Sequence, residues 1–248
     1  MESIQTELNV FGVQFPKQEI KLNKLEKQVL NLIPLGKENA KKGAYIADLL
    51  GINTRHLTDL ARELRLKHCD IGSTTYEGYY LFKNPHEYLE FISKYSKDYT
   101  RRNQVGEAMR LTPMAKKITI ETNQMVSNGI NIHGLIFPNQ ENELTKLEKL
   151  VLQLIPVGKE IALSCSDIAN VLDIDIRHVK ELVRRLRLKH CDIGSTTNGG
   201  YYIFQNTKEY LEFMTKFAEE QNRRKQVIEA MRVTPMAQKI MIETNQSA

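Results

Sequence analysis

One stretch of this chain occurs twice: the letters LRLKHCDIGSTT fill Leu64–Thr75 and return unchanged at Leu186–Thr197. The two blocks are 122 residues apart, and the same offset pairs most of the first half of the chain with the second. Roughly 60% of the paired residues are identical. A repeat of this length is too long for a solenoid and has the size of a small domain. The sequence therefore predicts an internal duplication that makes two tandem domains, residues 1–124 and 125–248.

The composition is that of an ordinary soluble globular protein. Hydrophobic residues make up 41% of the 248 residues and charged residues 26%, and the net charge is +5. This mildly basic balance permits a nucleic-acid partner without requiring one. The chain has three cysteines, an odd number, and it shows neither a signal peptide nor an apolar run long enough to span a bilayer. We therefore expect free thiols, a cytoplasmic location and no membrane contact.

Each repeat is expected to open with an extended segment and two helices. Leu8–Pro16 and its twin Ile130–Pro138 alternate loosely and end at proline, which predicts extended chain. From Leu22 the apolar residues recur at helical spacing, until Pro34 and a following glycine end the pattern. A short helix is expected over residues 44–50.

A third helix has the clearest pattern. Asn53 in the first repeat and Asp175 in the second are suited to cap its start, because a short side-chain acceptor can bond the first free amides. The opposite faces of this helix differ in character, with one apolar and one charged, so the apolar face should be buried. Two helices joined by a three-residue turn have the order of a helix-turn-helix. The residues of the apolar stripe are Leu57, Leu60, Ala61 and Leu64.

A hairpin and further helices complete each repeat. The second copy reads Asn198-Gly199 between two β-prone runs, which is a strong hairpin signal. Asn84-Pro85 is suited to start a helix that continues towards Met109, and Thr112-Pro113 restarts one by the same capping logic. We interpret Gln124–Gly129 as a polar link between the repeats.

The order of these elements carries a resemblance. Two helices, a turn, a third helix and a hairpin that ends in Gly78–Phe82 resemble the winged helix-turn-helix domain, a mainly α fold with small β-hairpins (α+β). The combination of LRLK, GYY, NP and EYL resembles winged helices of phages and plasmids in Gram-positive bacteria. The likeness covers Leu22–Tyr99 and Leu144–Gln221. It implies two winged-helix DNA-binding domains, each with a recognition helix in the major groove and a wing on the DNA backbone.

Candidate DNA contacts lie on the charged face of the third helix, at its C-terminal end and on the strand that follows. Arginine suits such contacts because its guanidinium group can bind guanine or phosphate through two hydrogen bonds. Basic and hydroxyl groups suit phosphate oxygens. In the first repeat the candidates are Thr54, Arg55, His56, Thr58, Asp59, Arg62, Arg65, Lys67, Ser73, Thr74 and Thr75. In the second they are Ile176, Arg177, His178, Lys180, Glu181, Arg184, Arg187, Lys189, Ser195, Thr196 and Thr197.

Plainer interpretations remain open for part of this set. Charges on a surface helix are often only solvated. However, Arg55, His56 and Arg62 recur in the second repeat although they should point away from the core, which favours a ligand. The hydroxyl groups of Ser73–Thr75 could equally cap the hairpin. Neither hairpin tip carries lysine or arginine, which argues against deep insertion into the minor groove.

Other recurring segments need a separate interpretation. His68–Asp70 and His190–Asp192 each place a histidine beside a cysteine, but structural zinc sites use separated pairs of ligands. We therefore expect no metal and interpret the cysteines as buried thiols. Arg101–Ala115 and Arg223–Ala237 form a third shared surface. Packing between the repeats or between subunits is its favoured role, and contact with the DNA backbone is the second.

The chain contains no phosphate-binding loop, nucleophile elbow or metal-binding helix. We therefore expect a protein without catalytic activity or cofactor, whose partner is double-stranded DNA and which could form a homo-oligomer through the helices after each hairpin. The favoured function is transcriptional regulation in a mobile element. The alternatives are a plasmid or phage replication initiator, and an adaptor that docks onto and inhibits a host protein.

Overall fold

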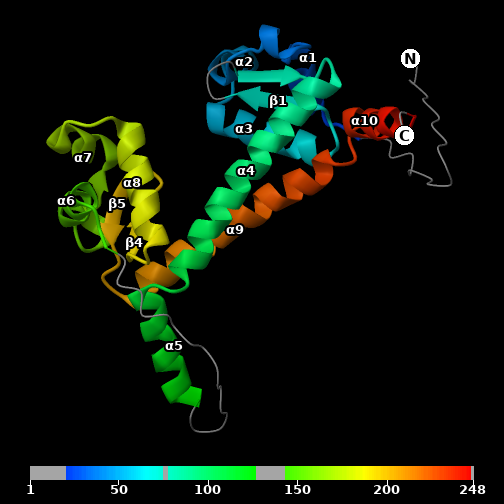
Figure 1. Cartoon of the computed structure of the whole chain (residues 1–248). Coiled ribbons are helices and arrows are strands. Elements are labelled where there is room, and N and C mark those ends of the chain that lie inside the picture. The colour runs from blue at the N-terminus through cyan, green and yellow to red at the C-terminus, as the bar shows by residue number, and fades with distance from the viewer. Residues whose placement is uncertain (1–20, 75–77, 127–142, 247–248) are drawn as a thin grey trace. The chain divides into compact units, whose positions relative to one another are not determined.

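The computed structural model describes residues 21–74, 78–126 and 143–246 (Figure 1). Within these ranges the chain is mainly helical with small antiparallel hairpins, as the sequence predicts. It divides into two compact units. Unit 1 joins the chain up to Lys97 with the chain from Arg224 onward, and unit 2 is Asp98–Arg223. The predicted extended segments Leu8–Pro16 and Ile130–Pro138 lie outside the described residues.

Three helices form the start of unit 1. Gly51 ends the second helix in a left-handed conformation with a φ of 64°, which glycine adopts at little cost. Asn53 caps the third helix as predicted, since its side-chain oxygen accepts a hydrogen bond from the amide of His56 at 2.8 Å. The elements are α1 (Lys24–Leu32), the short 3-10 helix η1 (Lys37–Asn39), α2 (Gly43–Leu50) and α3 (Thr54–Leu66).

The predicted apolar stripe of α3 lies at the centre of the first core. Leu57, Leu60 and Leu64 are buried together with Val29 of α1 and Ile46 of α2. Full burial of an aliphatic side chain contributes about 1.5–3 kcal/mol, so this stripe fixes which face of α3 turns inward. The opposite face is left to solvent.

A two-stranded hairpin follows α3. Strand β1 (Ile71–Thr74) pairs antiparallel with β2 (Gly78–Leu81), which confirms the predicted hairpin. Strand β2 is also bonded to the segment before α2: the Lys41 amide donates to the Tyr79 carbonyl at 3.1 Å, and the Tyr79 amide donates to the Lys41 carbonyl at 2.9 Å. These bonds hold the hairpin against the helices.

Unit 2 contains the same order of elements. Asp175 caps its third helix as predicted, accepting from the amide of Arg177 at 2.6 Å. A short additional strand pairs with the hairpin, so the sheet has three strands in the order β3-β5-β4. The elements are α6 (Lys146–Leu154), η2 (Lys159–Ile161), β3 (Leu163–Ser164), α7 (Cys165–Leu172), α8 (Ile176–Leu188), β4 (Ile193–Ser195) and β5 (Gly200–Ile203).

Each hairpin leads into a long helix and then a shorter one. Asn84 caps the first long helix as predicted, accepting from the amide of Glu87 at 3.0 Å. The helix restarted at Pro113 runs to Val126, so the segment Gln124–Gly129 begins inside a helix rather than as a link. These helices are α4 (Pro85–Met109), α5 (Pro113–Val126), α9 (Thr207–Met231) and α10 (Pro235–Gln246).

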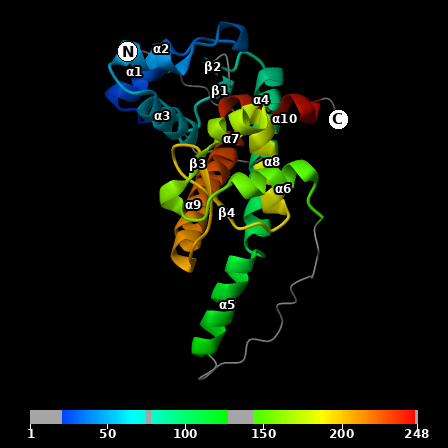
Figure 2. The ribbon, with the colours of Figure 1, turned by 90° about the vertical axis from the view of Figure 1, so that its left-hand side faces the viewer.

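The end of the second repeat completes unit 1. Tyr80, Phe82 and Phe91 of the first repeat form one core cluster with Met231 and Ala237 of the second, so that α10 packs against the hairpin and the start of α4 (Figure 2). Three polar contacts add to this cluster. The Tyr88 hydroxyl donates to the Met231 carbonyl at 2.9 Å, the Met236 amide donates to Asp70 at 3.0 Å, and His68 Nδ1 lies 3.0 Å from the Ala230 carbonyl oxygen.

The end of the first repeat completes unit 2 through the equivalent contacts. The Tyr210 hydroxyl donates to the Met109 carbonyl at 3.0 Å, the Met114 amide donates to Asp192 at 3.0 Å, and His190 Nδ1 lies 2.9 Å from the Ala108 carbonyl oxygen. The compact units therefore differ from the predicted division at residue 124, because each repeat gives its last helices to the unit that holds the other repeat's hairpin. This arrangement confirms a packing role between the repeats for the recurring segment around Met109.

Candidate nucleic-acid interface

The third helix of each unit presents an exposed polar face. Arg55 and His56 on α3 are exposed, and so are Arg177 and His178 at the equivalent positions of α8. Both pairs lie in the first turn, next to the capping residue, where helix geometry turns them away from the buried stripe. Thr54, Asp59, Ile176 and Lys180 are exposed on the same faces, and Arg62 is half-buried.

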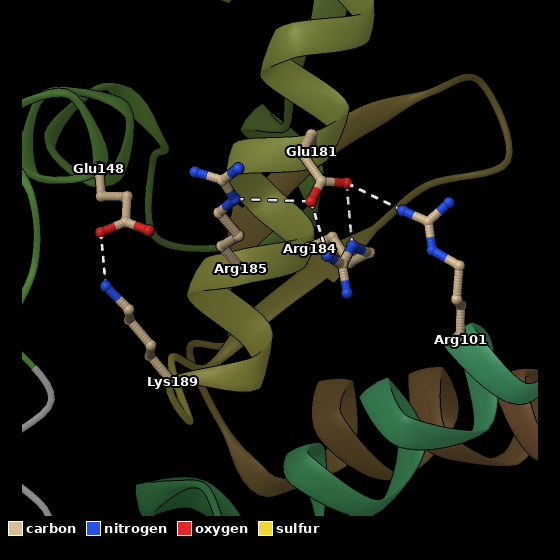
Figure 3. A network of polar contacts seen from close by, with 6 residues as sticks. All are labelled: Arg101, Glu148, Glu181, Arg184, Arg185 and Lys189. Carbon is tan, nitrogen blue, oxygen red and sulfur yellow. Dashed lines mark hydrogen bonds and ion pairs between the residues drawn. The ribbon is translucent and has the colours of Figure 1, made fainter.

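The face of α8 carries a connected group of charges around Glu181 (Figure 3). The Glu181 carboxylate accepts from Arg184 Nη2 at 2.6 Å and from Arg184 Nε at 2.9 Å. Arg185 Nε lies 3.5 Å from the same carboxylate, and Arg101 Nη2 of α4 lies 3.2 Å from it. The hydrogen bond from Arg184 is the main cause that lowers the pKa of Glu181, so this carboxyl group is ionised and holds three guanidinium groups.

Two predicted contact residues point into the protein instead. Arg65 is buried: its Nε donates to the Ile71 carbonyl and its Nη2 to the Ser73 hydroxyl, both at 2.9 Å. The guanidinium group also stacks over the ring of Phe91, with 5.0 Å to the centroid. Arg187 makes the same bond to the Ile193 carbonyl at 2.9 Å, and burial lowers its pKa to about 10. Both arginines join the third helix to the hairpin, so their expected role at phosphates is replaced by a structural one.

Lys67 and Lys189 are likewise engaged inside their units. Lys67 Nζ lies 2.6 Å from Oε1 of Glu26, a carboxylate of α1 whose side chain is only 1% exposed, and Lys189 pairs with Glu148 at 2.7 Å. Burial acts to raise the pKa of Glu26, but hydrogen bonds from Lys67 and from the amide of Asn23 outweigh it and leave the pKa lowered. These lysines therefore neutralise a buried carboxylate rather than facing a ligand.

We expect the change Lys67→Met to destabilise unit 1 by about 1–3 kcal/mol, because it leaves a buried carboxylate without its partner. Since the pKa of Glu26 is lowered in the folded state, the loss should be complete at neutral pH and shrink as the pH falls below about 4. Thermal unfolding at several pH values measures the effect. Lys27→Met, at an exposed position of α1, the helix that carries Glu26, is the control. Unchanged stability with weakened DNA binding would contradict the structural role.

The hydroxyl candidates divide between hairpin contacts and exposed positions. The Ser73 hydroxyl accepts from Arg65, and the Thr196 hydroxyl accepts from the amide of Gly200 at 3.0 Å, which supports the capping interpretation for both. Thr58 donates to the carbonyl of Thr54 at 2.9 Å. Thr197 is exposed, Thr74 and Ser195 are half-buried, and Thr75 lies outside the described residues.

Comparison with known proteins gives no match. No protein-family model, no curated protein and no solved structure matches this chain. Among the described residues, no helix is long and apolar enough to cross a membrane.

The His-Cys-Asp segments have a structural role in each unit. Asp70 accepts a hydrogen bond from the amide of Met236, as described above. His68 adopts the left-handed conformation, with a φ of 64°, just after the end of α3. Burial raises the pKa of Cys69 to about 11, as it does for Cys191, so these thiols are protonated. No group of three or more potential metal ligands occurs in the part of the chain that the structure describes.

Arg101 lies on this surface, although it is not among the DNA contacts that the sequence predicts for the third helix. It belongs to α4, 80 residues before Glu181, and the sequence grouped it with a shared packing segment. The recurrence of Arg101-Arg102 at Arg223-Arg224 was the one available signal. Local patterns could not connect it with α8, because the contact depends on the exchange of helices between the repeats.

Proposed function

We propose that this chain is a double-stranded DNA-binding protein with two winged helix-turn-helix heads that read paired half-sites. Its role would be to regulate transcription in a mobile element. The proposal assigns the protein a binding role, with no catalytic step and no cofactor. A replication initiator of a plasmid or phage is the alternative within the same class, since it would use the same surfaces.

The observation that carries the proposal is the exposed, capped face of α3 and of α8. Arg55 and Arg177 are exposed at equivalent positions there, and each is followed by an exposed histidine. A helix start whose polar face is exposed can enter the major groove, and arginine at its first turn can reach base edges. The hairpin beside each helix is then placed to approach the backbone.

The proposed interface is narrower than the sequence alone suggests. It keeps the candidate residues of the two helices that are exposed or half-buried, and it excludes the two arginines and two lysines that bind within the units. On α3 it consists of Thr54, Arg55, His56, Thr58, Asp59 and Arg62. On α8 it consists of Ile176, Arg177, His178, Lys180, Glu181 and Arg184, with Thr197 on the second hairpin.

A salt titration of duplex binding tests the proposal. If both heads bind, about four to eight phosphates are neutralised, so the logarithm of the affinity should fall with the logarithm of salt concentration at a slope of about −4 to −7. Fluorescence anisotropy with a labelled duplex measures this slope. A slope near zero, or no binding at low salt, removes DNA binding as the function.

Changing Arg55 or Arg177 to alanine tests the helices themselves. Each change should weaken binding to a selected site by about 1–3 kcal/mol and relax the preference at one base position. Both residues are exposed, so folding should be unaffected.

A footprint on DNA beside the protein's own gene supports a regulator, whereas a footprint confined to a replication origin supports an initiator.

Protein docking is a second candidate function, and one observation favours it. Among the described residues, three large apolar positions are exposed in both repeats, at Leu35 and Val157, Leu49 and Val171, and Leu89 and Leu211, each between 49% and 64% exposed. Exposed apolar side chains mark a docking site where they act together as one patch, and their recurrence in both repeats favours a shared use. Failure to bind DNA, together with binding of a host protein that is lost on Leu49→Ser and Val171→Ser, would establish this function instead.

A further inference from the structure

We propose that unit 2 carries the principal phosphate-binding surface of this protein, built from Arg184 and Arg185 of α8 and Arg101 of α4. The inference rests on the proposed DNA-binding function. It adds that the two heads differ in how strongly they bind phosphate. It also assigns a role to Arg101. This residue belongs to the first repeat, but it lies in unit 2, beside the third helix of the second repeat.

The geometry supports a prearranged group of guanidinium side chains. A single carboxylate, Glu181, contacts all three arginines at 2.6–3.5 Å, and it comes from the same helix as two of them (Figure 3). One negative charge against three positive charges leaves the group with a net charge of +2. The contacts restrain long side chains whose freedom would otherwise be lost when a ligand binds.

Arg101 and Arg185 are the two arginines of this group that remain accessible to a ligand. The side chains of Arg101 and Arg185 are 56% and 54% exposed, and each contacts Glu181 through only one nitrogen atom in the distances given above. A guanidinium group has five N–H donors, so each can hold Glu181 and still donate to phosphate oxygens. Arginine binds phosphate through paired hydrogen bonds, which suits the regularly spaced phosphates of duplex DNA.

The third helix of unit 1 has no comparable excess of charge. Its exposed or half-buried charges are two positive, Arg55 and Arg62, and two negative, Asp59 and Glu63. Arg187 of α8 is held by the Ile193 carbonyl. The other positive residues of this helix are Arg177, Lys180, Arg184 and Arg185, and they stand against Glu181 alone, because Lys180 replaces Thr58 and Arg185 replaces Glu63. Arg101 adds a fifth. At the third helix, attraction to a polyanion should therefore be stronger on α8, while α3 depends on specific contacts.

The test compares matched single-charge variants of the full chain. Arg101→Gln and Arg185→Gln each remove one exposed arginine of the cluster. Arg110→Gln is the control, since this arginine also belongs to unit 2, is 64% exposed and pairs with one carboxylate, Glu107. The probe is a labelled duplex of mixed sequence, and its affinity is measured by fluorescence anisotropy over a series of salt concentrations.

We expect Arg101→Gln and Arg185→Gln each to reduce the magnitude of the salt slope by about one, and the double variant by about two. The double variant should bind roughly tenfold more weakly at low salt. Arg110→Gln should leave the slope unchanged. A steep wild-type slope that the cluster variants alter no more than Arg110→Gln does would overturn this inference and leave DNA binding intact. A flat wild-type slope would instead reject the proposed function itself.

Discussion

Replacing Met231 with alanine should destabilise unit 1, although this residue belongs to the second repeat. Met231 is fully buried in the cluster formed by Tyr80, Phe82 and Phe91 of the first repeat. Truncating a buried methionine to alanine costs about 2–5 kcal/mol, because contacts are lost and a cavity remains. Amide hydrogen exchange should therefore accelerate in β1 and β2 while the amides of β4 and β5 keep their protection.

Met109→Ala is the matched control, because Met109 occupies the equivalent position of the first repeat. It is also fully buried, and it packs with Tyr202, Phe204 and Phe213 of unit 2. This change should accelerate exchange in β4 and β5 and spare β1 and β2. If each variant instead loosened the hairpin of its own repeat, the exchange of helices between the repeats would be wrong.

The exchange also changes what separate halves of the chain should do. A fragment that ends near residue 124 keeps the Tyr88 hydroxyl but lacks Met231, whose carbonyl accepts the hydrogen bond from it. The equivalent residue, Met109, is present in the same fragment. Two copies of the fragment could therefore complete one another, as the two repeats do in the full chain. Domain-sized fragments are thus a poor test of single-head DNA binding.

The helices and hairpins could be predicted because their signals are local. The capping residues Asn53, Asp175 and Asn84 stand next to the amides that they bond, and the stripe of α3 repeats within four turns. Such patterns are decided by a few consecutive residues and need no knowledge of the rest of the chain. The same holds for Pro113, which begins α5.

The partners of the last helices could not be predicted, and the reason lies in the duplication. Asp70 and Asp192 each cap a helix start. Each accepts a hydrogen bond from the amide of a methionine, and both methionines lie in identical TPMA segments. Both copies offer the same donor to the same acceptor, so the sequence permits pairing within a repeat as well as pairing between repeats. Only the path of the long helices distinguishes the two.

Some residues that the sequence predicts at phosphates, such as Arg65 and Lys67, instead make contacts inside the protein. The sequence could not show this, because those contacts are also distant along the chain. A basic residue at the end of a helix is usually exposed, and Arg65 fits that pattern in the sequence. Its burial depends on Ile71 and on Phe91, the second of which lies 26 positions further along the chain. The ion pair of Lys67 with Glu26 spans 41 positions. Contacts over such distances in sequence leave no local pattern.

Gly78→Ala should destabilise unit 1 about as strongly as a core truncation, and the second repeat supplies its control. Gly78 has a φ of 95°, and a Cβ atom there would lie 1.9 Å from the carbonyl oxygen of Lys41, which is backbone and is bonded to Tyr79. Strain and overlap together should cost about 3 kcal/mol or more. At the equivalent Gly200 the nearest atoms would lie 3.2 Å away, so Gly200→Ala should cost under about 1.5 kcal/mol. Hydrogen exchange in β2 and β5 measures both losses, and equal losses would show that the two hairpins are held in the same way.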